Sequence, residues 1–436
     1  MKTASASALS SALCFSSASE LARGIREREF SAEEVVRLHL QRIDVLNPCL
    51  NGLLAVASEA ALEQARAADH TLAQGEPVGP LHGVPFTVKD VYAVGETSSL
   101  RRAPGISGKL ALIEGPESSV IRRLRSAGAI LLGVSRATLW RDREEAYGPA
   151  HNPYDLARSP GGSSGGEAVT IAAGCSPLGW GSDSGGSLRQ PAHFCGLASL
   201  RPSNGRVPCA TDAGANDPRT VAGPLARSIR DVALALDIVS GLDPLDPTTL
   251  PLPRCNPRDI VVEGLRIAVH TSHALAPATA ETAACVVRAA AALASAGAVV
   301  EQQPPPDLDQ AWQLTLDYWA HCREEGTLSD YLRFQERWQR YRLALHAWMQ
   351  RWDLILCPVE AFPAAPAAAG TLQPFTYTAP YSLLGWPSAV VRAGTSEQGL
   401  PIGVQLIGRA HRDDVALAGA ASVEAALGGF HPPPLS

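Results

Sequence analysis

Residues 160–192, PGGSSGGEAVTIAAGCSPLGWGSDSGGSLRQPA, constrain this chain more than any other stretch. They contain two serine clusters flanked by glycine, GGSSGG at 161–166 and SGGS at 184–187. Because glycine has no Cβ, such loops bring backbone N–H groups close to a ligand and adopt conformations closed to other residues. The run between the clusters predicts one helix and one short strand. Two clusters of this kind are typical of a site where a hydroxyl attacks and backbone amides receive the developing charge.

Helices and strands alternate along much of the remaining chain. Ser31 with Glu34, in front of a periodic apolar run, is typical of a capping box that opens a helix. Residues 311–352 are predicted to be helical and hold five of the eight tryptophans. Strands are predicted at residues 84–89, 129–134, 265–270, 298–301, 353–357, 388–394 and 401–408. This alternation indicates an α/β fold with helices on both faces of a sheet.

The stretch at 160–192 also resembles the signature of the amidase signature family of serine hydrolases. The match runs without a gap from Gly161 to Ala192 and includes Asp183. The family carries a lysine in an upstream strand, and the segment GVPFTVKD supplies Lys89. The closing segments YSLLGWPSAVV and LPIGVQLIGRA match as well, so the resemblance covers nearly the whole chain. It implies the amidase signature fold, a mixed central β-sheet covered by helices on both faces.

The resemblance implies a catalytic triad of Lys89, Ser163 and Ser187. Ser187 would attack the substrate carbonyl, and Ser163, preceded in the family by a cis peptide bond, would relay the proton to neutral Lys89. A lysine with the ordinary pKa of about 10.4 serves as a base only if its pKa falls, and burial on an apolar strand supplies that desolvation. The backbone N–H groups predicted to form the oxyanion hole are those of Ser184, Gly185, Gly186 and Ser187.

The same resemblance predicts an acyl-enzyme mechanism on a small, fairly apolar amide or carbamate, with esters as a further class. The tryptophan-rich helical region is expected to be mostly core, with the wall of an apolar substrate cleft as the alternative. Candidate pocket residues are Leu139, Trp140, Tyr147 and Trp319. No cofactor and no metal is expected, because the nine cysteines are scattered and show no paired ligand spacing.

Composition narrows the partners and the cellular setting. A net charge of −6 argues against nucleic acid, which needs a basic binding face. No run of about 18 or more uncharged apolar residues suggests a membrane span. Scattered cysteines are typical of reduced thiols, so a cytoplasmic protein is expected. We expect a single domain over residues 1–436 with a flexible tail at 1–17, as a monomer or a homodimer.

Three alternatives compete with this hypothesis. GGSSG at 161–165 also satisfies G-x-S-x-G, but an α/β-hydrolase would need an upstream oxyanion motif and would leave Ser187 without a role, although His411 lies downstream. A phosphate-binding loop would need G-K-[ST], or G-x-G-x-x-G between a strand and a helix, and neither occurs. A glutaminase-type subunit of a tRNA-dependent amidotransferase has the same fold and would require partner subunits. That third alternative stays open.

Other polar residues near the motifs are expected to be structural. Asp183 is interpreted as a buried carboxylate paired with Arg189, with a catalytic acid as the alternative. His82 and His193 are expected to be packed or hydrogen-bonded rather than catalytic bases. Ser164 is expected to cap a helix.

Overall fold

One mixed β-sheet runs through the protein and carries strands from both ends of the chain. The computed structural model describes residues 12–95, 100–106, 110, 112–139, 141–209, 217–322, 326–367 and 375–435. Within these residues the sheet has twelve strands, in the order β3-β1-β4-β2-β5-β7-β6-β11-β12-β10-β8-β9. The strands are β1 (Leu53–Val56), β2 (Pro85–Lys89), β3 (Arg101–Arg102), β4 (Ile130–Ser135), β5 (Leu178–Asp183), β6 (Ala198–Arg201), β7 (Val221–Ala226), β8 (Arg266–Val269), β9 (Val299–Gln302), β10 (Leu354–Pro358), β11 (Ser388–Thr395) and β12 (Pro401–Gly408).

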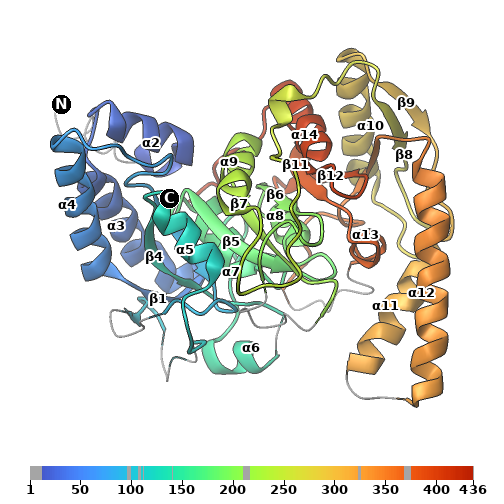
Figure 1. Cartoon of the computed structure of the whole chain (residues 1–436), viewed down its shortest axis with the longest axis horizontal. Coiled ribbons are helices and arrows are strands. Elements are labelled where there is room, and N and C mark those ends of the chain that lie inside the picture. Colours follow the sequence, from blue (N-terminus) through green and yellow to red (C-terminus); the bar gives the residue numbers. More distant parts are fainter. Residues whose placement is uncertain are drawn as a thin grey trace.

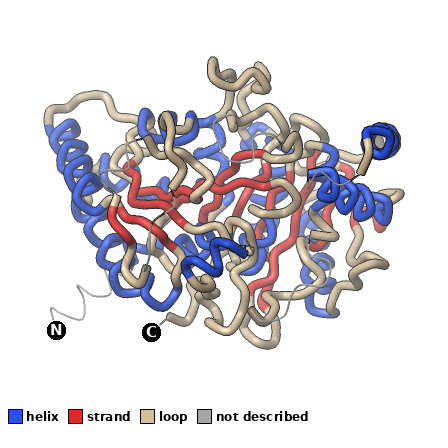
Figure 2. The backbone as a smooth tube through the Cα atoms, turned by 90° about the horizontal axis from the view of Figure 1, so that it is seen from below, coloured by secondary structure: helices blue, strands red, loops and turns tan. Residues whose placement is uncertain are grey.

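Helices cover both sides of this sheet, as Figure 2 shows from below. The helices are α2 (Ala18–Arg26), α3 (Ala32–Leu50), α4 (Ser58–Ala73), α5 (Ser119–Ser126), α6 (Arg141–Tyr147), α7 (Gly165–Ala172), α8 (Arg189–Phe194), α9 (Ile229–Val239), α10 (Ala280–Ser295), α11 (Leu308–Cys322), α12 (Leu328–Met349), α13 (Ala379–Leu384) and α14 (Asp413–Leu427), with a 3-10 turn η1 at Pro257–Asp259. The predicted α/β class and the mixed sheet are therefore confirmed. Within the described ranges, each helix is too short or too polar to cross a bilayer.

The register of the central strands brings the two serine clusters and Lys89 to the same edge of the sheet. Strand β2 is parallel to β5, with Val88 opposite Trp180. Parallel strands end at the same edge, so Lys89 at the end of β2 lies beside the end of β5 at Asp183. The loop at 184–187 follows β5 directly, and α7 begins just after Ser163.

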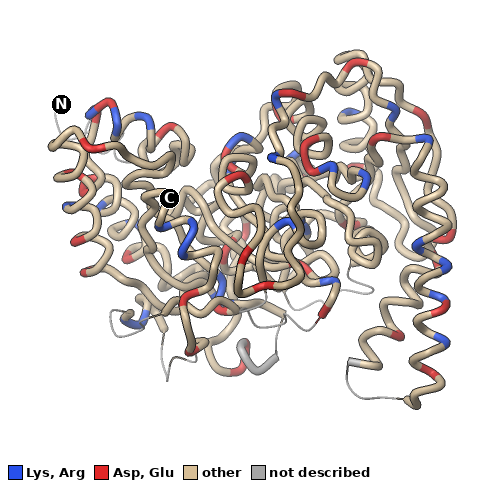
Figure 3. The backbone as a smooth tube through the Cα atoms, in the orientation of Figure 1, with Lys and Arg blue, Asp and Glu red and all other residues tan. Residues whose placement is uncertain are grey.

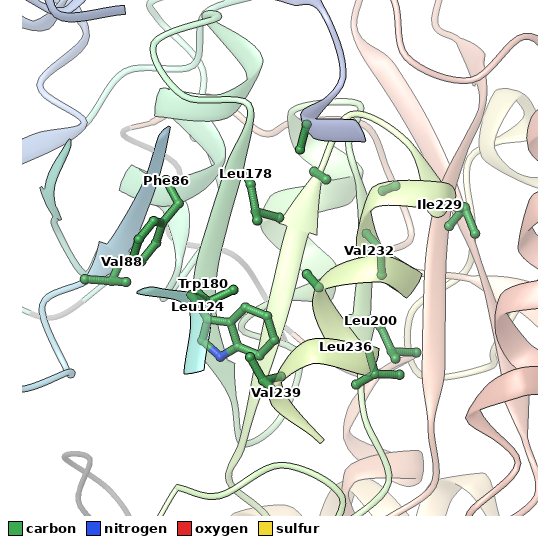
Figure 4. Packing of buried hydrophobic residues seen from close by; sticks show 14 of the residues in the cluster. Phe86, Val88, Leu124, Leu178, Trp180, Leu200, Ile229, Val232, Leu236 and Val239 are labelled. Atoms are coloured by element: carbon green, nitrogen blue, oxygen red, sulfur yellow. The ribbon is translucent and has the colours of Figure 1, made fainter. Parts of the chain in front are cut away.

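Side chains alternate along β2 between a hydrophobic face and a polar face. Phe86 and Val88 pack with Trp180 of β5 and Leu124 of α5 in the main core (Figure 4). Because successive side chains on a strand point to opposite faces, Lys89 points away from this cluster, toward α7. Phe86 and Val88 therefore hold β2 in the core, and the opposite face of the strand carries Lys89.

Most strands predicted from apolar runs are confirmed, and the predicted strands β11 and β12 pair with each other in antiparallel orientation. The helix predicted to open with a capping box is confirmed too, since Ser31 caps α3 and bonds reciprocally with Glu34. Strands β1, β3, β6 and β7 were not predicted. β1 and β6 have four residues each, and β7, VAGPLA, contains a glycine and a proline that usually indicate a loop. Its Pro224 pairs with Trp180 inside the sheet.

The tryptophan-rich region is largely helical, as predicted, and forms the two helices α11 and α12. α11 and α12 pack on each other at one side of the molecule, at the right of Figure 1. α12 starts with a capping box in which Thr327 and Asp330 bond reciprocally. Both acidic and basic residues lie along this helix (Figure 3), and Arg337 pairs with Asp317 across to α11.

The flexible tail predicted at 1–17 is wrong for residues 12–17, while residues 1–11 lie outside the described part. Arg227 donates hydrogen bonds to the carbonyl oxygens of Cys14 and Ser16, and Phe15 stacks on Phe430. Ser17 caps α2. An arginine buried behind β7 thus holds the segment in place. Because the sheet includes strands from both chain ends, we propose that residues 1–436 form one domain.

Candidate active site

Lys89, the last residue of β2, is completely buried and lies between two hydroxyl groups. Its Nζ donates hydrogen bonds to Ser163 Oγ at 2.7 Å and to Ser182 Oγ at 3.0 Å. Burial lowers the pKa of the Lys89 amine from 10.5 to about 8, although the negative charges of Asp90, Asp183 and Glu167 act in the opposite direction. A substantial fraction of this amine is therefore neutral near pH 8.

The backbone at Gly162 and Ser163 places the Ser163 hydroxyl beside the Lys89 amine. The Gly162–Ser163 peptide bond is cis, as the family resemblance implied. Ser163 O accepts a hydrogen bond from Thr138 N–H at 2.9 Å. A Cβ on Gly162 would lie 2.5 Å from Leu139 Cγ, so a side chain there would displace that neighbour. Leu139 itself, at 45% exposure, covers this backbone.

The loop at 184–187 places Ser187 next to the first serine cluster. Ser164 N–H donates to Ser187 O at 3.1 Å, which joins the two clusters directly. Gly186 O accepts from Gln190 N–H at 2.8 Å, at the start of α8. Because the two ends of a trans peptide unit point in opposite directions, Ser187 N–H points away from α8. This geometry is suited to an oxyanion hole at the loop.

Glycine is required in this loop by close contacts. Gly186 has a φ of 153°, and a Cβ there would lie 2.3 Å from Thr378 Oγ1. Ser184 is held through its side chain, whose Oγ lies 2.5 Å from Thr220 Oγ1. These contacts hold the loop at 184–187 in place, and with it the backbone N–H groups predicted to form the oxyanion hole.

Asp183 and Arg189 form the buried pair that was predicted. Asp183 Oδ1 and Oδ2 accept from Arg189 Nη2 and Nε, both at 3.0 Å, and neither side chain is exposed. Oδ2 also accepts from Leu188 N–H at 3.1 Å. Burial alone would raise the pKa of Asp183, but the charge and hydrogen bonds of Arg189 outweigh it and hold the pKa below its ordinary value. The pair closes the loop at 184–187, and the predicted pairing of Asp183 with Arg189 is confirmed.

We expect Asp183→Asn to destabilise the protein by about 3–5 kcal/mol, because it leaves the Arg189 guanidinium buried without its counter-charge. Urea unfolding followed by circular dichroism measures the loss. Asp414→Asn, which breaks an exposed contact with Arg412, is the control and should stay within about 0.5 kcal/mol of wild type. Equal stabilities of the two variants would contradict the role given to Asp183.

Of the four predicted pocket residues, two lie at the serine clusters. Leu139 borders Gly162, and half-buried Trp319 of α11 has its Cζ2 3.9 Å from where a Cβ on Gly185 would lie. Tyr147 ends α6, and its carbonyl oxygen accepts from Asn51 Nδ2 at 2.8 Å, which ties it to the end of α3. Trp140 lies outside the described residues. Leu139 and Trp319 are therefore the two pocket candidates with geometric support.

Two polar neighbours of Lys89 were not predicted. Ser182 accepts from Nζ, and Glu167 of α7 accepts hydrogen bonds from Thr87 on β2 and Ser135 on β4. Burial raises the pKa of Glu167 to about 7, against the effects of Ser135, Thr87 and Lys89. Both residues lie inside the stretch at 160–192, but only the register of β2 with β4 and β5 shows that they meet at Lys89.

The histidines flanking the motifs are packed, as predicted. His193 accepts from Gly403 N–H at 2.8 Å through Nδ1, and its Nε2 lies 3.0 Å from Phe362 O. Burial lowers the pKa of His193 to about 4. The Nε2 of His82 lies 3.0 Å from Ala68 O.

The Ser163 hydroxyl is hydrogen-bonded to the Lys89 amine and not to a histidine, which disfavours the α/β-hydrolase alternative. Among the described residues, no three His, Cys, Asp or Glu side chains gather as metal ligands would.

A buried lysine hydrogen-bonded to a serine, with a second glycine-flanked serine nearby, is an arrangement in which an amine could activate a hydroxyl for attack. The comparisons agree. The family described as Amidase matches residues 34–333 and 319–417, so this chain belongs to the amidase family of hydrolases that act on carbon–nitrogen bonds.

Three relatives illustrate the range of the family. Indoleacetamide hydrolase of Bradyrhizobium diazoefficiens is 32% identical over 94% of this chain and 86% of its own length. A glutamyl-tRNA(Gln) amidotransferase subunit of Salinispora tropica is 30% identical over 96% of this chain and 99% of its own. A bacterial aryl acylamidase structure of the amidase signature family superposes with a TM-score of 0.81 at 25% identity, covering 94% of this chain and 96% of that one. The amidase signature fold is thereby shown.

Proposed function

We propose that this protein hydrolyses small, fairly apolar amides or carbamates through Lys89, Ser163 and Ser187. The observation that carries the proposal is the 2.7 Å contact between the buried amine of Lys89 and the hydroxyl of Ser163. The hydrogen bond from Ser164 to Ser187 adds the second serine to the same site. Burial supplies the lowered pKa that a lysine needs to act as a base.

The proposed reaction has two stages. In the first, Ser187 Oγ forms a bond to the carbonyl carbon while its proton passes to Ser163 Oγ and the proton of Ser163 passes to neutral Lys89. The carbonyl π electrons become an oxyanion, which the N–H groups at 184–187 hold. Lys89 then returns a proton to Ser163, Ser163 gives a proton to the leaving nitrogen, and the C–N bond breaks as the carbonyl forms again. In the second stage, water loses a proton to Ser163 and its oxygen bonds to the acyl carbon. The bond to Ser187 Oγ then breaks, Ser187 takes a proton back from Ser163, and the acid is released.

The residues around the loop favour an apolar substrate. Half-buried Trp319 lies over Gly185, and Trp312 meets it edge to face with ring centroids 6.0 Å apart. Leu139 adds an exposed aliphatic side chain beside Gly162. Aromatic and aliphatic surfaces bind apolar groups by burying their area. Similarity to an indoleacetamide hydrolase and to an aryl acylamidase supports amides that carry an aromatic group.

The second candidate is a glutaminase-type subunit of a tRNA-dependent amidotransferase. Similarity to the Salinispora tropica amidotransferase protein over 96% of this chain favours it. Glutamine carries a charged carboxylate, which an aromatic or aliphatic surface does not pair. The pocket contacts of Trp319 and Leu139 therefore support the free-standing amidase over this alternative.

A hydrolysis screen on the purified chain separates the two candidates. The panel contains arylacetamides, anilides, aryl carbamates, aryl esters, short aliphatic amides and glutamine. We expect turnover of the aryl amides or carbamates without any added protein, and no glutaminase activity. Glutamine hydrolysis as the main activity would favour the amidotransferase role, and no turnover of any carbonyl substrate would overturn the proposal.

We expect Trp319→Ala to raise KM for an arylacetamide about 10-fold, because it removes an aromatic contact together with buried area. KM for propionamide should change less than about 3-fold, since so small a group buries little surface. Trp348→Ala is the matched control, because Trp348 packs on Trp352 at the far end of α12. Equal KM changes for both substrates would contradict a pocket role for Trp319.

A further inference from the structure

Glu360 is a buried carboxylate on the loop after β10, and the proposed relay does not use it. Its side chain is 1% exposed, and its contacts are hydrogen-bond donors. Oε2 accepts from Gln190 Nε2 at 2.8 Å and more weakly from Phe375 N–H at 3.5 Å. Oε1 accepts from Ala361 N–H at 3.3 Å. A carboxylate fits this place because every neighbour donates.

Gln190 connects Glu360 to the first serine cluster. Its side chain is also buried, and its Oε1 accepts from Gly162 N–H at 3.2 Å. An amide side chain has a donor end and an acceptor end. Because the NH₂ group of Gln190 donates to Glu360, the side-chain oxygen of Gln190 faces the N–H of Gly162. Glu360 thereby determines which way the Gln190 amide points.

We propose that Glu360 is a positioning residue, which orients Gln190 so that it fixes the backbone of Gly162 and, with it, the hydroxyl of Ser163. The proposal rests on the relay function proposed above. Gly162 directly precedes Ser163, whose Oγ lies 2.7 Å from Lys89 Nζ. If Gln190 released Gly162, the Ser163 hydroxyl would be free to move against Lys89, and a misplacement of about 1 Å costs on the order of 100-fold in rate.

The same carboxylate also touches the other half of the site. Phe375 N–H points at Glu360, and Phe375 Cδ1 lies 2.5 Å from where a Cβ on Gly186 would be. Glu360 therefore contacts both the residue that packs on the proposed oxyanion loop and the residue that holds the Ser163 backbone. It links two segments that are far apart in the chain.

The test compares Glu360→Leu, Gln190→Leu, Glu360→Gln and the double leucine variant on the best substrate from the screen. We expect each single leucine variant to lower kcat about 10- to 100-fold with KM within about 3-fold, because the acylating geometry changes and the pocket does not. Glu360→Gln should recover most of kcat, since its amide oxygen can still accept from Gln190. The double variant should be about as slow as one single variant, because both act through Gly162.

A control variant and a labelling rate distinguish loss of the positioning role from misfolding and from failure of the proposed function. Glu424→Leu is the control: it removes another carboxylate that accepts a backbone N–H, from Ile229, away from the site, and should leave kcat unchanged. The rate at which a fluorophosphonate labels Ser187 should fall in parallel with kcat. An inactive, unlabelled wild type would refute the proposed function. Unchanged kcat in Glu360→Leu, multiplicative losses in the double variant, or no recovery in Glu360→Gln would overturn the positioning role.

Discussion

Replacing Ser187 by alanine is expected to lower kcat for an aryl amide by about 10⁶-fold, the size of loss that follows removal of the nucleophile from a serine hydrolase triad. The physical reason is that Ser163 and Lys89 remain but have no hydroxyl to activate at the carbonyl. The residual rate comes from binding and from the backbone N–H groups at 184–187. Steady-state kinetics at high enzyme concentration measures it. The fold should be unaffected, because Ser187 is only half-buried.

The nucleophile can also be identified covalently. An aryl carbamate or fluorophosphonate should add its mass to the peptide that contains Ser187 in the wild type and leave Ser187→Ala unlabelled. Ser176→Ala is the matched control: it removes a buried hydroxyl that donates to Leu178 O at 2.7 Å just before β5. That variant should keep its labelling and its kcat. Label on Ser163 in place of Ser187, or near-normal turnover by Ser187→Ala, would contradict the assignment of the two serines.

The family resemblance, together with the local chemistry of short segments, predicted the main parts of the candidate site. Lys89 ends an apolar strand, and the two serines sit among glycines that only close backbone contacts explain. Asp183 and Arg189 are six residues apart, so their pairing could also be expected. Each of these features involves residues that are close together in the chain, so each can be recognised without knowing how distant segments pack.

The supporting residues could not be predicted, because their contacts depend on how distant segments meet. Glu360 meets Gln190 across 170 residues, and Ser182 reaches Lys89 only through the register between β5 and β2. Strand β7 was missed for a related reason. Its Gly223 is required because a Cβ would lie 2.4 Å from Leu200 O, and that close approach follows from packing with β6. Such residues look like loop residues until the neighbouring strand is known.

Lys89→Met is expected to lower kcat/KM by about 10²–10⁴-fold, the usual contribution of a general base. Methionine keeps the volume and the apolar stem of lysine in a site with no exposure, so the fold should persist. Thermal unfolding checks that point. Wild-type activity in the variant would refute the relay, since Ser163 would then need no amine.

The pH profile tests the same amine in the intact protein. Burial lowers the pKa of Lys89 to about 8, and the neutral amine is the active form. Activity should therefore be full above pH 8 and fall about tenfold per pH unit below it. The Glu167 carboxylate raises the pKa of Lys89, so Glu167→Gln should move this limb to lower pH. Lys89→Met should lose the limb altogether. A limb that stays in Lys89→Met, or that moves to higher pH in Glu167→Gln, would assign the titration to another group.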